Sequence, residues 1–260
     1  MAKITAVHLS GKIGKLVCFE RNGKPISRIQ ADDVKQTKAT KKAAKVFGKA
    51  VRVAKFLRQG LAPALPRIGG RWGEYRLADA VSKALDPQKT TASQTNTAPL
   101  LQLAYNRKTN LRERLRVSLE TDWSQPGRVI LTIPALNPVK HIPAPAHTQQ
   151  VHWRIAVSGS SITRPIITGA QSIVIDMPYE ATLLPAQRIA LPFTVQPDTL
   201  NVLMVSLQYT AEKKRGPLLI KAQEWWPADI VGVQYETPVK KGNKKASASK
   251  RPVKLAKKIK

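Results

Sequence analysis

Six cationic side chains recur at intervals of three or four residues between positions 37 and 59. They are Lys38, Lys41, Lys45, Lys49, Arg52 and Lys55. Residues spaced in this way share one face of an α-helix, so the six form a stripe that could contact a row of phosphates. Like charges at this spacing repel each other by about 0.2–0.5 kcal/mol per pair. We therefore expect an anionic partner; a core helix whose lysines face water, or a helix on a membrane surface, are the alternatives.

The last 24 residues form a second cationic region. Residues 237–260 hold ten Lys and Arg and no Asp or Glu. Blocks of like charge repel and stay extended, so we predict a disordered polybasic tail that binds polyanions; an inert solubilising extension is the alternative. The expected anion-binding residues of the tail are Lys240, Lys241, Lys244, Lys245, Lys250, Arg251, Lys254, Lys257 and Lys258.

The net charge is concentrated at the two ends of the chain. The 260 residues contain 44 Lys and Arg against 16 Asp and Glu, a net charge of +28. Residues 1–60 carry +12 and residues 237–260 carry +10, whereas residues 116–236 carry only +1. Solubility of a small domain requires a net charge of only about 2–8. The distribution therefore indicates a neutral module with two regions that meet an anion.

The adjacent pair Trp225 and Trp226 is the one aromatic cluster. Exposed Trp rings stack on bases or sugars, so both residues are candidate aromatic contacts. Side chains alternate along a strand, which predicts one ring inside and one at a surface. Trp123 and Trp153 are predicted to be core aromatics. A sugar-binding module that uses the Trp pair is a third, weaker hypothesis.

No set of residues points to catalysis. Three histidines, His141, His147 and His152, lie within twelve residues, but the segment has no Cys and contains prolines that interrupt it. Cys18 is the single cysteine and is predicted to be a small packed residue. Residues 11–15 (GKIGK) lack the Ser or Thr that a phosphate-binding loop requires. We therefore predict a protein that is not an enzyme, with no metal site and no cofactor.

Two helices and one hairpin have the clearest signals. Apolar residues recur every three or four positions over residues 37–59, with Thr37 as N-cap and Gly60 as C-cap. A shorter helix is predicted over residues 74–85. The dipeptide Asn22-Gly23 lies between two β-rich runs, which predicts a hairpin with a type I′ turn.

From residue 116 onward the hydrophobic pattern has a period of two. Turn residues separate the short apolar runs, which favours an antiparallel β-sandwich over a barrel. The predicted strands are residues 116–120, 128–134, 151–157, 172–177, 188–195, 200–209, 218–222 and 229–235.

These signals together predict an α+β fold. An N-terminal β-hairpin and basic amphipathic helices precede an antiparallel β-sandwich and a disordered basic tail. The expected division is a basic hairpin and helix region, a linker or exposed loop, a sandwich domain and the tail. Their ranges are 1–87, 88–99, 100–236 and 237–260.

The N-terminal motif GKxGxxVxxxRNGKP resembles that of a family of uncharacterised bacterial proteins. The segments LTIPALNP (131–138) and GPLL (216–219) extend the resemblance over roughly residues 10–235. The resemblance implies cytoplasmic synthesis and a two-part organisation, and it implies no activity. The basic tail departs from the pattern of the family.

The leading functional hypothesis is non-enzymatic binding of nucleic acid or another polyanion through its backbone, with little sequence preference. The alternative is a structural subunit of a larger assembly, such as a phage-like particle or a filament, whose basic regions contact an anionic neighbour. The partners expected besides a polyanion are further copies of the chain, in a homo-oligomer or a larger assembly. The sequence contains no run of about 18–20 apolar residues, so no membrane-spanning helix is predicted. The N-terminus does not resemble a secretory signal, so we expect a cytoplasmic protein, nucleoid-associated if it binds DNA.

Overall fold

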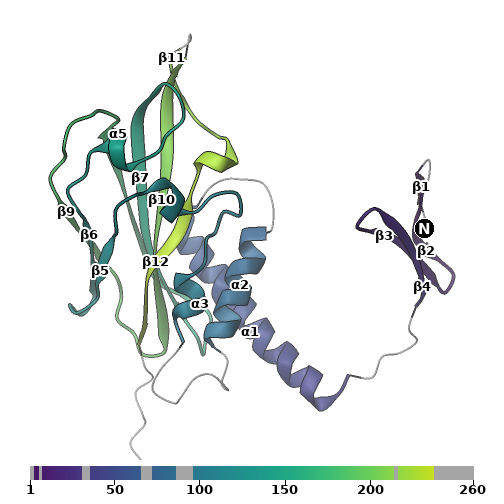
Figure 1. Cartoon of the computed structure of the whole chain (residues 1–260). Helices are drawn as coiled ribbons and strands as arrows, with labels where there is room; N and C mark the ends of the chain where they lie inside the picture. Colours follow the sequence, from purple (N-terminus) through teal and green to yellow (C-terminus); the bar gives the residue numbers. More distant parts are fainter. Residues whose placement is uncertain are drawn as a thin grey trace, which may run out of the picture. The chain divides into compact units, whose positions relative to one another are not determined.

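The structure, a computed structural model, has an α+β fold with three antiparallel sheets in the part of the chain that it describes. This confirms the fold class predicted from the sequence. The described residues are 3–5, 8–30, 36–65, 72–85, 96–213 and 216–236. The chain divides into two compact units, Met1–Lys45 and Val46–Lys260 (Figure 1). The predicted tail lies outside the described residues.

The first unit contains a small four-stranded sheet in which each strand pairs with the next. Its strands are β1 (Lys3–Thr5), β2 (His8–Ile13), β3 (Leu16–Arg21) and β4 (Lys24–Ile29). Asn22 and Gly23 have positive φ angles of 53° and 74°, as a type I′ turn requires. The predicted hairpin between β3 and β4 is therefore confirmed, and β1 and β2 extend it.

Helix α1 spans Lys38–Leu61, in agreement with the predicted helix. Thr37 is its N-cap, because its side-chain oxygen accepts a hydrogen bond of 3.1 Å from the Thr40 N–H. Gly60 is not the C-cap that we predicted, since the helix continues through it. A Cβ atom at Gly60 would lie 2.9 Å from the Ala170 Cβ. The glycine therefore permits close approach of the helix to a sheet.

A five-stranded antiparallel sheet forms the centre of the second unit. The strands β11, β10, β7 and β8 are neighbours in that order, and β12 pairs with β10. Their bounds are β7 (Thr148–Ser161), β8 (Ile167–Pro178), β10 (Thr199–Lys213), β11 (Gly216–Leu219) and β12 (Ala228–Glu236).

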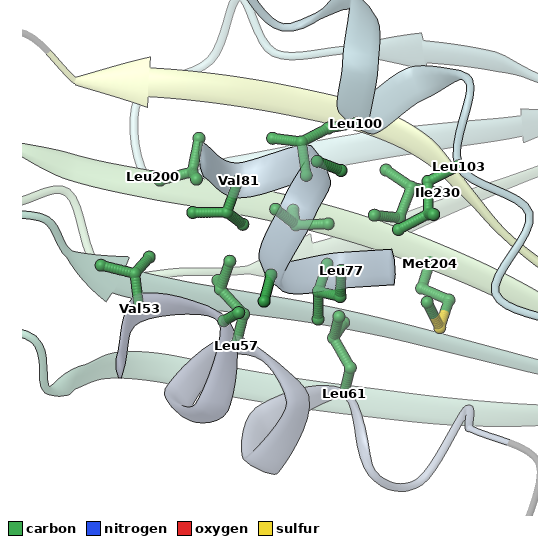
Figure 2. Close-up of a cluster of buried hydrophobic side chains, with 14 of the residues drawn as sticks. Val53, Leu57, Leu61, Leu77, Val81, Leu100, Leu103, Leu200, Met204 and Ile230 are labelled. Atoms are coloured by element: carbon green, nitrogen blue, oxygen red, sulfur yellow. The ribbon is translucent and has the colours of Figure 1, made fainter. Parts of the chain in front are cut away.

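Helices cover one face of this sheet. Leu57 and Leu61 of α1 and Leu77 of α2 (Trp72–Ala84) share a buried apolar cluster with residues of β10 and with α3 (Ala98–Leu101) (Figure 2). The β10 residues of this cluster, Leu200, Val202 and Met204, occupy even-numbered positions. This is the alternation expected of a strand.

A three-stranded sheet shares a second buried cluster with the odd-numbered residues of the central strands. Trp153 is fully buried in this cluster together with Leu203 and Leu207, which confirms its predicted core position. The three strands are β5 (Glu120–Asp122), β6 (Arg128–Ile133) and β9 (Gln187–Pro192). Short elements complete the unit, namely α4 (Leu111–Arg114), α5 (Pro138–His141) and the 3₁₀ turn η1 (Gln223–Trp225).

A further sequence expectation differs from the structure. The predicted strand over residues 116–120 is wrong, since β5 begins only at Glu120 and the Arg116 N–H donates to the His141 carbonyl. Residues 88–95 of the predicted linker lie outside the described residues, and α3 begins at Ala98. Because α2 and residues 46–61 of α1 bury apolar side chains on the central sheet, they belong to the same compact unit as the β region.

Candidate nucleic-acid interface

Helix α1 presents cations on the side away from its buried face. Its buried positions are Ala50, Val53, Ala54, Leu57, Gly60 and Leu61. Of the six predicted stripe residues, five are exposed and Lys49 is partly buried. The helix therefore anchors its C-terminal half through apolar contacts and leaves the stripe accessible. We call Lys38, Lys41, Lys45, Lys49, Arg52 and Lys55 the α1 stripe.

The first two turns of α1 are exposed on every side. Ala39 and Ala43 belong to the apolar face predicted from the sequence, yet both are exposed, and continuous burial begins only at Ala50. The predicted apolar face is thus correct in register and too long by two to three turns. Phe47 and Val51 are also 49% and 40% exposed.

No carboxylate neutralises the α1 stripe within the described residues. The helix contains no Asp or Glu along its 24 residues. Within the described residues, the one ion pair of α1 joins Arg58, which is not part of the stripe, to Glu74 at 2.8 Å. Arg52 donates to the Gly48 carbonyl, and the Lys55 ammonium lies 6.0 Å from the centre of the Phe56 ring. The repulsion between stripe cations therefore has no relief from acidic side chains in the described structure.

The N-terminal sheet carries a second cationic surface that the sequence analysis missed. The register pairs Lys12 with Val17, Val17 with Arg28, and Arg21 with Lys24, so their side chains lie on one face. Glu20, the one acid of β2–β4, lies on the opposite face because it precedes Arg21 in the strand. We call Lys12, Arg21, Lys24 and Arg28 the β-face cations.

An aromatic ring lies at the centre of that face. Phe19 pairs with Ile26, and the Arg28 guanidinium lies 5.6 Å from the centre of the Phe19 ring. Arg21 and Lys24 are directly opposite each other, an arrangement that is unfavourable for like charges. The signal was present in the sequence, since the Asn22-Gly23 turn fixes the register and period-two alternation then assigns each cation to a face.

The Trp pair does not offer open rings for stacking. Trp226 is only 6% exposed, which matches the inside position expected for one ring of the pair. Trp225 is half-buried, with the Arg114 guanidinium 3.9 Å from its ring centre and Tyr209 against it edge-on. The Arg114 side chain also donates to the Glu224 carbonyl. Both rings therefore fix η1 against the β region.

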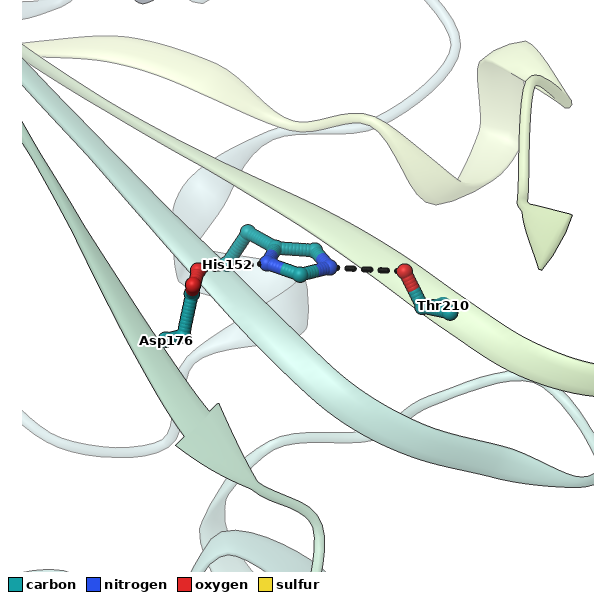
Figure 3. Close-up of polar contacts among 3 residues, drawn as sticks. All are labelled: His152, Asp176 and Thr210. Atoms are coloured by element: carbon teal, nitrogen blue, oxygen red, sulfur yellow. Dashed lines mark hydrogen bonds and ion pairs between the residues drawn. The ribbon is translucent and has the colours of Figure 1, made fainter. Parts of the chain in front are cut away.

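His141 and His152, near each other in the sequence, contact different partners in the structure. His152 lies between two side chains, with Nδ1 2.6 Å from an Asp176 carboxylate oxygen and Nε2 2.7 Å from the Thr210 hydroxyl (Figure 3). His141 instead accepts a hydrogen bond from the Asn137 N–H at 2.9 Å. In the residues that the structure covers, no three His, Cys, Asp or Glu side chains gather as a metal site would require.

The His152 contacts join three neighbouring strands of the central sheet. Asp176 is on β8 and is paired in register with His152 on β7, and Thr210 is on β10. The Thr–His–Asp order resembles a nucleophile with its base, but Asp176 is exposed whereas His152 and Thr210 are partly buried. The cavity described below is lined by other residues. We therefore interpret these contacts as a polar link across the sheet.

A cavity of about 630 Å³ opens beside α4 and β12. Asp229 lines it; one carboxylate oxygen accepts a hydrogen bond of 2.7 Å from the Leu111 N–H, and the other is buried with no partner among the described residues. Burial raises the pKa of Asp229 to about 6. Arg112 and Arg116 line the same cavity, so two guanidinium groups accompany the one carboxylate there.

Cys18 is 7% exposed and lies 3.3 Å from the Ser27 hydroxyl, in agreement with the packed role predicted for it. No helix among the described residues is long and apolar enough to cross a membrane. Comparison of the chain with protein-family models, curated proteins and solved structures found no match.

Proposed function

We propose that the protein binds nucleic acid non-enzymatically, through the phosphate backbone and with little sequence preference. The observation that carries this proposal is the α1 stripe, six cations on one helix with no acidic partner in the described residues. An external polyanion would relieve their mutual repulsion, and it would release its own condensed counterions on binding.

The dimensions of α1 support contact with a continuous backbone. Lys38 and Lys55 are separated by a rise of ~25 Å along the helix axis. A DNA duplex carries ~15 phosphate charges over that distance. The exposed first two turns allow cations on several sides of the helix to approach phosphates.

The β-face cations and the tail would supply further contacts. Phe19 at the centre of the β-face could add stacking on an unpaired base. The tail cations, which lie outside the described residues, would add further phosphate contacts. The neutral β region, whose two facing sets of strands support a sandwich arrangement, would hold α1 through the buried cluster around Leu57.

A pair of charge-matched variants tests the proposal. In the first, the six cations of the α1 stripe are replaced with Gln. In the control, six exposed cations of the second unit are replaced with Gln, namely Arg107, Arg128, Lys140, Arg164, Arg188 and Lys221. Binding to a mixed-sequence duplex is measured by fluorescence anisotropy.

We expect the stripe variant to bind about 100-fold or more weakly at ~100 mM salt, and the control to bind within about tenfold of the wild type. Equal losses of affinity in the two variants would show that net charge, and not the stripe, governs binding. Retained binding in the stripe variant would contradict the proposal.

A further inference from the structure

The outer edge of β8 lacks a partner in the described part of the chain. β8 ends the order of the central sheet, and it pairs there with β7. An edge strand presents a row of unpaired backbone N–H and C=O groups that can pair with another chain. The edge is therefore a ready template for strand addition.

Side chains along this edge are exposed and mostly uncharged. Residues 170–174 are exposed on both faces, with Ile173 at 42% and Val174 at 50%. Natural edge strands are commonly protected by Lys, Pro or a bulge. In β8, the pairing register with β7 shifts near the start of the strand, opposite Gly159 and Ser160. Pro178 is the last residue of the strand. Asp176 carries the one charge between the register shift and Pro178.

At the opposite edge of the sheet, part of the outermost strand is covered. The start of β12 is covered by a neighbouring segment, because Ala104 forms a bridge with Asp229 and the Tyr105 N–H donates to the Ala228 carbonyl at 2.8 Å. The start of β12 is therefore protected by a neighbouring segment, whereas no backbone pairing covers the outer edge of β8 in the described residues.

We propose that two copies of the chain associate through antiparallel pairing of their β8 strands. A two-fold axis perpendicular to the sheet would pair even-numbered residues with even-numbered residues and odd-numbered with odd-numbered. It would also keep the helices of both copies on the same face of the joined sheet. The two five-stranded sheets would then continue as one sheet.

The β8 sequence is self-complementary in one such register. With Val174 opposite Val174 of the second copy, Ile173 faces Ile175 and Asp176 faces Ser172. Apolar residues meet apolar residues, and the two carboxylates do not oppose each other. Asp176 is also already bound to His152 within its own chain. This match favours a second copy over a strand of unrelated sequence.

The proposal is independent of nucleic-acid binding, and the experiment keeps the two separate. Nuclease-treated protein is studied by analytical ultracentrifugation at high salt, over a series of concentrations. Under these conditions phosphate contacts are weak, whereas backbone pairing and apolar burial persist. We expect a concentration-dependent dimer for the wild-type chain.

Two lysine variants locate the interface. Val174→Lys places two cations opposite each other at the two-fold axis and should weaken dimerisation by about tenfold or more. Val139→Lys is the matched control, since Val139 is 47% exposed on α5, and it should dimerise like the wild type. Circular dichroism of both variants checks that each is folded. A monomeric wild type, or a Val174→Lys protein that dimerises normally, would overturn the proposal.

A cysteine variant tests the register. In a Cys18→Ser background, Val174→Cys should form an intermolecular disulfide on mild oxidation, because directly opposed residues in an antiparallel pair have Cβ atoms about 4.5–5.5 Å apart. Val139→Cys in the same background should not. Equal cross-linking of the two variants would contradict the register around Val174.

Discussion

At the scale of single residues, Gly60 shows how a contact across the fold can decide what a residue does. The sequence pattern predicted a C-cap, since glycine commonly follows the last turn of a helix. The structure places Gly60 inside α1, where Ser158 and Ala170 leave no room for a side chain. That contact is non-local, so no local pattern could predict it.

Substitution of two glycines in α1 tests this interpretation. Gly60→Ala should lower the free energy of unfolding by about 1–3 kcal/mol, because the added methyl group overpacks the contact with β7 and β8. Gly48→Ala is the control in the same helix, where a Cβ meets nothing within 4 Å. It should raise stability by up to ~1 kcal/mol through helix propensity. Urea unfolding of both variants measures the difference, and equal effects would contradict the packing role.

Asp229 predicts a specific dependence of stability on pH. Its pKa is raised from 3.8 to about 6 in the folded protein, because burial disfavours the charged carboxylate. The unfolded chain therefore loses this proton at lower pH than the folded chain. Stability should fall as the pH rises from about 4 to 6, and this contribution should be constant above that range.

The variant Asp229→Asn isolates this effect. Asn retains an oxygen that can accept the Leu111 N–H and does not ionise in this range. The stability of the variant relative to the wild type should increase by up to ~3 kcal/mol between pH 4 and pH 7. Urea unfolding at a series of pH values measures it. A relative stability that does not change with pH would show that Asp229 is not the buried group responsible.

At the scale of elements, local signals predicted α1, α2 and the β3–β4 hairpin. Capping, turn residues and hydrophobic period depend only on neighbours in sequence, and here they were sufficient. The stripe was predicted in the same way. The β-face becomes apparent only when the register fixed by the Asn22-Gly23 turn is combined with the alternation of side chains on both strands. The extent of α1 burial was overestimated because it depends on contacts with the central sheet.

The β-face cations predict a second contribution to binding. Replacement of Lys12, Arg21, Lys24 and Arg28 with Gln should reduce the magnitude of the salt slope, d log K/d log[salt], by up to ~4, with about one unit for each phosphate that the variant no longer neutralises. The measurement is a salt titration on single-stranded and duplex DNA. An unchanged slope would show that this face does not contact phosphates.

At the scale of the whole molecule, the uneven distribution of charge was visible in the sequence, but the assembly of the neutral region was not. The strands were largely predicted by their period, although their order in the sheets arises from non-local pairings such as β7 with β10. The order of the strands leaves β8 at the edge of the central sheet. It also places the helices on one face of that sheet and β6 on the other.

The tail should contribute to the affinity for nucleic acid independently of the α1 stripe. A chain that ends at residue 236 loses ten cations and no acidic residue. It should bind nucleic acid more weakly and with a shallower salt slope than the full chain, but with the same preference among sequences, since backbone contacts read no bases. Anisotropy measurements on duplexes of different sequence compare the two chains. A change in sequence preference would contradict the assigned role of the tail.

The salt dependence of binding by the full, nuclease-treated protein tests most directly the proposal that the cations of this chain bind a phosphate backbone. We predict a linear decrease of log K with log[salt], with a slope of about −5 or steeper if the α1 stripe alone contacts six phosphates. The slope should be the same for duplexes of unrelated sequence. Absence of binding at ~50 mM salt, or a slope near zero, would contradict the proposal.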